Sequence, residues 1–286
     1  MNGSALYGQR SNYSAAPPCP RHPSVRSVDY CKRCNRPICV DCAIPTEVRS
    51  ICVECSGQKR VQIRHTTPYI TYTLMGACVV VYVCGVISPL LWQYMAFTPL
   101  VGLIQPWRFL STAFLHSGIV HLLFNMSALY FVGISLEQIL GKWRFIILYA
   151  LSAIGGSAAV LAWVLFAPGT YNQITVGASG AVFGLFAAIF VIQKRAGLDT
   201  RSIIGLLVVN FLYGFIAPNI SWQAHAGGML TGLLVAWVLI MLMQPRPGLT
   251  ARQQEIRSVL ASVGMIVAMC ALIALIYRVI FEVLGS

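Results

Sequence analysis

Charged residues are scarce in this 286-residue chain, and acidic residues are the scarcest. Only 10% of the residues are charged and 57% are hydrophobic, whereas soluble domains average about 25% charged residues. With a mean hydropathy of +0.73, this composition excludes an ordinary soluble domain. Residues 1–18 have no apolar core, so we expect no secretory signal there.

The few charges are concentrated near the N-terminus. Residues 1–66, the head, hold ten Lys/Arg and four Asp/Glu, and residues 67–286, the body, hold the same numbers. The head also holds seven of the ten cysteines. The cations of the body cluster in short connections between apolar runs, so membrane topology explains the net charge of +12 and we expect no nucleic-acid partner.

Long apolar runs make up most of the body. A membrane span needs roughly 20 such residues to cross about 30 Å of hydrocarbon. Seven stretches qualify, of which the fourth and fifth are short: about 69–91, 118–137, 144–167, 177–194, 202–217, 221–243 and 258–283. They predict an all-α polytopic membrane protein, with a six-helix core over 69–243 and a linker and seventh helix over 244–286.

Cations in alternate connections predict the orientation. The head and the connections after the second, fourth and sixth stretches contain Lys or Arg, whereas 168–176 and 218–220 contain no charge. The positive-inside rule then predicts a cytosolic N-terminus and an exoplasmic C-terminus. We expect a multi-pass protein of a bacterial plasma membrane, in contact with its lipid bilayer.

Segment 92–117 is apolar but interrupted. Pro99 and Pro106 disfavour one continuous helix, and Arg108 places a cation within the run. Its Trp and Tyr residues favour the headgroup level. We expect an exoplasmic loop that lies partly in the interface and packs on the bundle, an unstructured loop being the alternative.

Four polar residues share one depth when each is counted from the outer end of its helix. At 1.5 Å per residue, His121 and Asn125 lie roughly 5 and 10 Å down the second stretch, Ser179 roughly 3 Å down the fourth, and His225 roughly 6 Å down the sixth. All four fall in the outer third of the bilayer. The alternative interpretation of each residue is that it only forms hydrogen bonds with the other polar residues of an ordinary helix bundle.

These side chains suit acyl transfer. A serine hydroxyl needs a base to take its proton, which His225 can do for Ser179. His121, Asn125 and the backbone N–H of Ser179 at a helix N-terminus can then stabilise an oxyanion. The body has four acidic residues, at 137, 199, 255 and 282, and we expect none of them to complete a triad, which leaves a Ser–His dyad with no cofactor.

Small residues predict close contact between the helices that carry the pair. Gly180 and Gly184 form one GxxxG motif, and Gly228 and Gly232 form another, three and seven residues after His225. In lipid, such spacing lets helix backbones approach closely. We expect the His225 face to pack against the Ser179 face.

The combined pattern resembles the rhomboid family of intramembrane serine proteases. The similarity rests on His116, His121 and Asn125, on Gly177-Ala178-Ser179-Gly180, and on Ala224-His225-Ala226-Gly227-Gly228 with Gly232. It covers about residues 69–243, and Trp107-Arg108 and Glu137 match further family motifs. The resemblance implies Ser179 as nucleophile, His225 as base, His121 and Asn125 as oxyanion stabilisers, and transmembrane proteins as substrates, cut near the exoplasmic side. Phe183 stands where many members have Tyr.

Four ligand pairs lie in the head at zinc-knuckle spacing: Cys19 and His22, Cys31 and Cys34, Cys39 and Cys42, Cys52 and Cys55. Two residues between ligands suit half of a tetrahedral site. A cross-brace would bind one Zn²⁺ through Cys19, His22, Cys39 and Cys42, and a second through Cys31, Cys34, Cys52 and Cys55. The first three pairs resemble a B-box zinc finger, which implies a binding module with a cytosolic partner. Disulfides or free thiols are the alternative, which a reducing cytosol disfavours.

We therefore predict a disordered tail (1–18), a zinc-finger domain (19–56), a basic linker (57–68), the protease core (69–243) and the linker with the seventh helix (244–286). A catalytically silent membrane adaptor is the second hypothesis, although such relatives usually lose Ser or His. A transporter would need charged or metal-binding residues across the midplane, where we find none.

Overall fold

The computed structural model describes residues 16–46, 49–56, 67–216, 220–244 and 248–284. Most of the predicted disordered tail (1–18) and of the basic linker (57–68) lies outside these residues, as does Arg246. The chain divides into two compact units between residues 63 and 64. Each unit is described by itself.

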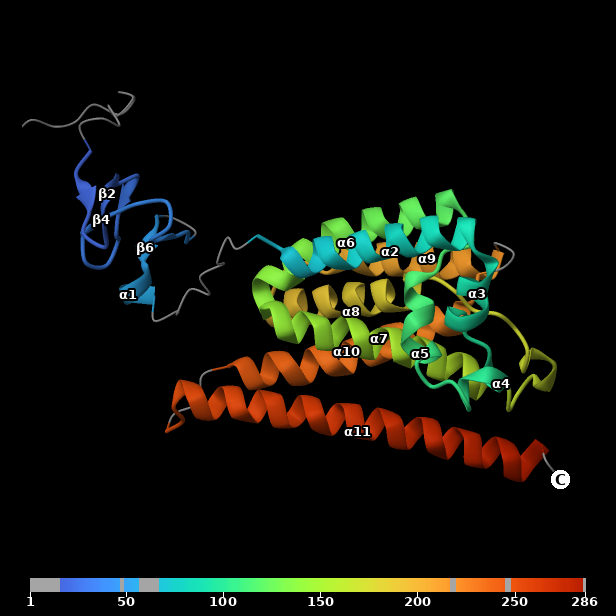
Figure 1. Ribbon diagram of the computed structural model, residues 1–286. Helices are drawn as coiled ribbons and strands as arrows, with labels where there is room; N and C mark the ends of the chain where they lie inside the picture. Colours follow the sequence, from blue (N-terminus) through green and yellow to red (C-terminus); the bar gives the residue numbers. More distant parts are fainter. Residues whose placement is uncertain (1–15, 47–48, 57–66, 217–219, 245–247, 285–286) are drawn as a thin grey trace, which may run out of the picture. The chain divides into compact units, whose positions relative to one another are not determined.

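The N-terminal unit consists of short antiparallel strand pairs (Figure 1), and cysteines make up most of its buried core. The pairs are β1 (Pro18–Cys19) with β2 (His22–Arg26), β3 (Asp29–Tyr30) with β4 (Pro37–Ile38), and β5 (Ala43–Ile44) with β6 (Ile51–Cys52), followed by α1 (Val53–Ser56). Ile38 is the one buried apolar residue besides cysteine in the core of the described part of this unit. So small a core needs another source of stability.

The second unit is helical. Its main helices are α2 (Tyr69–Ile87), α6 (Ile119–Leu140), α7 (Lys142–Trp163), α8 (Ser179–Arg195), α9 (Arg201–Ile216), α10 (Trp222–Met243) and α11 (Ala251–Leu284). Among the described residues, five helices are long and apolar enough to span a membrane, namely α2, α6, α7, α10 and α11. The predicted fourth and fifth stretches form α8 and α9, with 17 and 16 residues. The fold class is thus confirmed as a helical polytopic protein with a small cysteine-rich N-terminal region.

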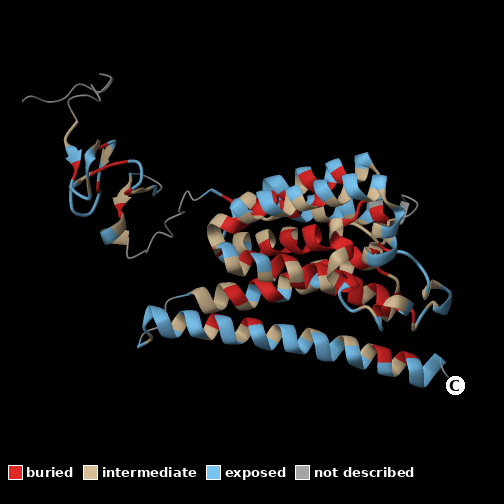
Figure 2. Cartoon of the chain, in the orientation of Figure 1, coloured by how far each residue is buried: buried red, intermediate tan, exposed pale blue. Residues whose placement is uncertain are grey.

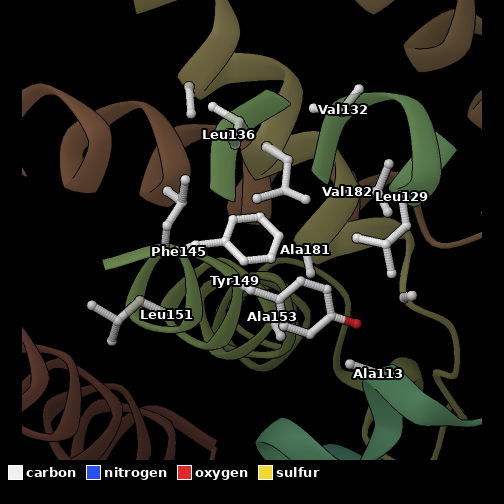
Figure 3. Close-up of a cluster of buried hydrophobic side chains, with 14 of the residues drawn as sticks. Ala113, Leu129, Val132, Leu136, Phe145, Tyr149, Leu151, Ala153, Ala181 and Val182 are labelled. Atoms are coloured by element: carbon white, nitrogen blue, oxygen red, sulfur yellow. The ribbon is translucent and has the colours of Figure 1, made fainter. Parts of the chain in front are cut away.

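Burial separates the inner helices from the outer ones (Figure 2). In α7, 67% of the apolar stretch is buried within the unit, but in α11 only 6% is. Figure 3 shows Phe145 and Tyr149 of α7 packed among Leu129 and Leu136 of α6 and Ala181 of α8. Helices α7, α8 and α10 therefore form the centre, and the apolar surface of α11 faces outward.

The first span ends earlier than the sequence indicated. It was expected to continue to residue 91, but α2 ends at Ile87 and Ser88 is extended, with φ −129° and ψ 108°. The residue before a proline avoids the helical region, and Pro89 has no N–H to continue the helix. Pro89 instead begins a separate helix, α3 (Pro89–Met95).

Segment 92–117 is ordered, which removes the alternative of an unstructured loop. After α3 it forms α4 (Pro99–Gly102), α5 (Arg108–Ser111) and the 3₁₀ turn η2 (Thr112–Phe114). Arg108 is buried, and its guanidinium donates to the carbonyls of Ala96 (2.5 Å) and Gln93 and to Oε1 of Gln105 (2.7 Å). One cation thus holds the loop together by satisfying three acceptors.

Glu137, which matches a family motif in the sequence, caps the start of α2. Its Oε1 accepts the N–H of Ile70 (3.0 Å), and its Oε2 accepts the N–H and hydroxyl of Thr71 (2.8 Å each). The first N–H groups of a helix have no partner within the helix, and a carboxylate there also complements the helix dipole. The buried Glu137 thereby attaches α2 to α6.

Candidate active site and metal centres

Ser179 and His225 lie in direct contact. Ser179 is the first residue of α8, and His225 lies in the first turn of α10. Nε2 of His225 is 2.9 Å from Oγ of Ser179, and only 5% of His225 is exposed. A hydroxyl bonded to a buried imidazole is the arrangement that activates serine for attack on an acyl group.

The predicted close contact between the two glycine motifs is confirmed. A Cβ on Gly228 would lie 2.0 Å from the carbonyl oxygen of Gly180, and a Cβ on Gly232 would lie 2.3 Å from Cα of Gly184. Any larger residue would overlap backbone atoms that cannot rotate away. The absence of side chains at these positions allows α10 to approach α8 closely enough for the Ser179–His225 contact.

Packing orients the imidazole of His225. Phe183 stacks on it with 4.1 Å between ring centroids and 15° between ring planes. Its Nδ1 is buried and has no hydrogen-bond partner among the described residues. Gly214 of α9 lies beside that nitrogen, where a Cβ would be 3.2 Å from it. The ring is therefore held by shape, with only Nε2 bonded.

His121 lies next to Gly177, two residues before Ser179. Gly177 has φ +125°, which favours glycine, and a Cβ there would lie 2.8 Å from Nε2 of His121 and 3.7 Å from Oγ of Ser179. Nδ1 of His121 is 3.0 Å from Oγ of Ser117. The Nε2 edge of His121 therefore lies next to the turn that carries Ser179.

Asn125 is directed mainly toward its own helix. Its Nδ2 donates to the carbonyl of His121 (2.9 Å), and the residue is buried. An amide nitrogen has two N–H donors, so one remains for another acceptor. The predicted quartet thus falls into a bonded Ser179–His225 pair, with His121 beside it and Asn125 one helical turn further on.

None of the four acidic residues of the helical unit bonds to His225. Glu137 caps α2, and Asp199 accepts the N–H of Arg201 (2.9 Å). Glu255 bonds Trp143 and Arg144, and Glu282 pairs with Arg278 (2.8 Å). Each of these carboxylates thus bonds a partner other than His225.

Sequence analysis did not single out three residues that support the serine turn. Phe97 pairs with Thr175 as an antiparallel bridge, the hydroxyl of Thr112 donates to the carbonyl of Thr175, and Gly177 N donates to the carbonyl of Thr112 (3.1 Å). These contacts join residues 63 to 78 positions apart, so no local signal reveals them. The contact of Ser117 with His121 is different, because its i, i+4 spacing could have been recognised.

In the N-terminal unit, the eight predicted ligands form two groups. They are Cys19, His22, Cys39 and Cys42, and Cys31, Cys34, Cys52 and Cys55, and within each group the ligand atoms lie within 4.8 Å of one another. These are the cross-brace groups predicted from the spacing. Both could hold a metal ion.

The distances between ligand atoms fit a tetrahedral ion. Nδ1 of His22 lies 3.2 Å from Sγ of Cys39 and 3.4 Å from Sγ of Cys42, and Sγ of Cys34 lies 3.6 Å from Sγ of Cys52. A tetrahedron with Zn–S of about 2.3 Å and Zn–N of about 2.0 Å has edges of about 3.5–3.8 Å. A disulfide requires about 2.05 Å between sulfurs, and all the cysteines are free thiols.

The pKa values within each group move apart because the thiols lie close together. Burial raises the pKa of Cys19, but backbone N–H groups outweigh it and lower the pKa to about 6. Burial, with the neighbouring thiols of Cys39 and Cys19, raises the pKa of Cys42 to about 12. In the second group, burial raises the pKa of Cys31 but backbone N–H groups outweigh it and lower the pKa to about 6, whereas hydrogen bonds with the thiols of Cys52 and Cys34 raise the pKa of Cys55 to about 12. Several thiolates can coexist so closely only beside a positive ion.

Comparisons with known proteins agree with the geometry of the helical unit. A family model described as Rhomboid domain matches residues 103–242. RHOMBOID-like protein 2 of Arabidopsis thaliana is 38% identical over 146 residues, which cover 48% of this chain and 43% of that protein. The putative rhomboid protease YdcA of Bacillus subtilis is 35% identical over 150 residues, which cover 49% of this chain and 70% of that protein.

The matched proteins include one whose name marks it as inactive. The inactive RHOMBOID-like protein 8 of Arabidopsis thaliana is 36% identical over 147 residues, which cover 49% of this chain and 40% of that protein. The matches thus span less than half of the length of both Arabidopsis relatives. Overall similarity therefore does not separate active from inactive proteins.

Proposed function

The chain belongs to the rhomboid family, and on that premise we propose that it is an intramembrane serine endopeptidase. Its substrates are transmembrane proteins, cut near the exoplasmic end of the spanning segment. The observation that carries this proposal is the 2.9 Å contact between Nε2 of His225 and Oγ of Ser179. An adaptor would have no need for such a contact.

The reaction proceeds in two proton-coupled steps. Nε2 of His225 takes the proton of Ser179 as Oγ attacks the scissile carbonyl, and then gives that proton to the leaving amine as the C–N bond breaks. Water attacks the resulting ester with His225 again as base, which releases the second product and restores the serine. His225 must carry its resting proton on Nδ1, the buried nitrogen beside Gly214.

We assign three donors to the oxyanion. They are the N–H of Ser179 at the start of α8, Nε2–H of His121 beside the serine turn, and the second N–H of Asn125. A neutral His121 that donates through Nε2–H has an unprotonated Nδ1, which can only accept a hydrogen bond. The hydroxyl of Ser117, whose Oγ is 3.0 Å from Nδ1, can donate that bond. Loss of one such donor costs about 3 kcal/mol, roughly 100-fold in rate.

A cleavage assay tests the proposal. The purified full chain in detergent is expected to cut a reporter transmembrane segment, and both Ser179→Ala and His225→Ala are expected to lose cleavage. Ser135→Ala is the matched control, because its exposed hydroxyl bonds only to the carbonyl of Phe131 within α6. Cleavage by Ser179→Ala at the wild-type rate would refute the assignment.

The alternative is a catalytically silent adaptor that binds transmembrane clients. The matched protein named as inactive gives this alternative its support. The presence of both Ser179 and His225 in bonded geometry favours the enzyme. A wild-type chain that captures a reporter segment without cutting it would establish the adaptor.

For the N-terminal unit we propose two structural Zn²⁺ ions in a B-box-like module that binds a cytosolic partner. Bound zinc would supply the stability that its small core lacks. Metal analysis of the full chain is expected to find two zinc ions, and Cys39→Ser and Cys52→Ser are each expected to lose one. Cys84→Ser, an exposed cysteine of α2, should keep both. A wild-type content near zero would contradict the proposal.

The proposed domain division and orientation place this module in the cytosol and the serine end of the bundle at the exoplasmic side. Cysteines introduced as Asn172→Cys and Leu198→Cys lie in connections that precede and follow α8. An impermeant thiol reagent added outside intact cells should label only the first. Labelling of the second alone would reverse the orientation.

A further inference from the structure

α11 contributes no residue to the Ser179–His225 pair, yet one of its side chains bonds the loop that pairs with Thr175, four residues before Ser179. Its buried residues are Ser258, Ser262, Tyr277 and Ile280. Tyr277 is 5% exposed, whereas Phe281, one turn further on, is 52% exposed. Tyr277 is therefore the one aromatic side chain that α11 buries within the described part of the unit.

Tyr277 packs against the segment from α3 to α5, residues 89–111, here called the α3–α5 loop. Its hydroxyl donates to the carbonyl of Pro99 at 2.7 Å. Its ring meets the edge of Phe109, with 6.4 Å between centroids and 80° between planes. Gly102 makes room for it, because a Cβ there would lie 2.8 Å from the Tyr277 oxygen and 2.7 Å from Phe97. A buried tyrosine hydroxyl bonded to a loop carbonyl holds that loop in one position.

This loop is the support of the serine turn. Phe97 is fully buried, lies in contact with Phe109 (centroids 4.6 Å apart), and exchanges backbone hydrogen bonds with Thr175 (2.9 and 3.3 Å). Two residues after Thr175 comes Gly177, at φ +125°, and then the turn into Ser179. A continuous set of contacts thus leads from Tyr277 through Phe97 and Thr175 to the nucleophile.

The other end of α11 is also attached. Glu255 accepts from Nε1 of Trp143 (2.8 Å) and pairs with Arg144, both at the start of α7. Glu255 and Tyr277 are separated by about 33 Å of helix. Between them Met265, Met269 and Ile273 pack on the bundle. Figure 1 shows α11 running beside α10 and α7 to the region of α4. The helix is therefore a fixed support from which Tyr277 reaches the loop.

We propose that Tyr277 is a positioning residue for Ser179, through which α11 holds the α3–α5 loop and with it the serine turn. This inference rests on the proposed proteolytic function. The proposal gives α11 a role in the chemical step, which its exposed apolar surface does not suggest.

The test uses Tyr277→Phe in the full chain, because this change keeps the ring and removes only the hydroxyl. We expect kcat to fall about tenfold with KM within about twofold, since the loss of one buried hydrogen bond shifts the serine and leaves substrate binding intact. We also expect slower labelling of Ser179 by a fluorophosphonate. Amides of residues 97–102 and 171–177 should exchange faster with deuterium, although those of α7 should not.

Phe281→Leu is the matched control, because Phe281 is an exposed aromatic residue one turn further along α11, and it should change none of these measurements. Because a smaller folded fraction would by itself lower the apparent kcat, kcat is expressed per active site, counted from the final extent of fluorophosphonate labelling. Wild-type exchange at Thr175 and Gly177 in Tyr277→Phe, or an unchanged kcat, would overturn the inference. If the wild-type chain itself cuts nothing, the proposed function fails, and the exchange measurement still decides whether Tyr277 holds the serine turn.

Discussion

The cap that Glu137 places on α2 allows a change in stability to be derived from named atoms. In Glu137→Gln the amide oxygen can replace Oε2 and still accept both donors of Thr71. The NH₂ group then faces the N–H of Ile70, which had bonded Oε1 at 3.0 Å. Rotating the amide only moves the conflict to Thr71. The variant loses one charge-assisted hydrogen bond and leaves donors unsatisfied in either orientation.

The magnitude follows from these losses. A hydrogen bond to a charged group contributes about 1.5–3 kcal/mol, and an unsatisfied buried donor costs about 1–3 kcal/mol. The charge at the helix N-terminus adds about 0.3–1 kcal/mol. We therefore expect a loss of about 3 kcal/mol, which lowers the apparent unfolding temperature by about 6–12 °C. Thermal unfolding of the detergent-solubilised chain, followed by tryptophan fluorescence, measures it.

Two variants serve as references. Glu282→Gln makes the same chemical change at an exposed ion pair with Arg278, where we expect less than about 0.5 kcal/mol. Thr71→Val keeps the shape and removes only one hydroxyl donor, for about 1 kcal/mol. If Glu137→Gln and Glu282→Gln lower the unfolding temperature equally, the cap does not stabilise α2 and the reasoning is wrong.

Two further predictions concern the helices around the serine. Gly232→Ala places a Cβ 2.3 Å from Cα of Gly184, so we expect at least about 2 kcal/mol of destabilisation and loss of cleavage. The control is Gly264→Ala, because Gly264 has open space around it. This variant should be neutral or slightly stabilising in the same unfolding assay. Ser117→Ala removes the hydroxyl beside Nδ1 of His121, so we expect kcat to fall about fivefold. Ser117→Thr keeps a hydroxyl and should restore kcat. Equal kcat for Ser117→Ala and wild type would show that this hydroxyl does not orient the imidazole.

Much of the site could be anticipated because its signals are local or periodic. Counting residues from helix ends places Ser179 and His225 at one depth, since an α-helix rises by a constant amount per residue. The GxxxG motifs could be interpreted for a related reason, as residues four apart share a helix face. Zinc-knuckle spacing likewise grouped the eight ligands of the N-terminal unit.

Other features could not be predicted from sequence. The break at Ser88 was missed because an apolar run continues across it, and only the backbone geometry imposed by Pro89 ends the helix there. Glu137 matched a family motif, but the sequence did not indicate which groups it bonds. Its hydrogen-bond donors, Ile70 and Thr71, lie 67 and 66 positions away.

The sequence by itself determined the membrane-spanning class, the composition of the site and the two ligand groups, because hydropathy, helical periodicity and ligand spacing are properties of short segments. Only the tertiary structure decided how the serine turn is supported. Its contacts come from Phe97, Thr112 and, through the loop, Tyr277 at the far end of the chain. Hydrogen bonds between distant residues depend on how the helices pack, and no pattern within one segment encodes that packing.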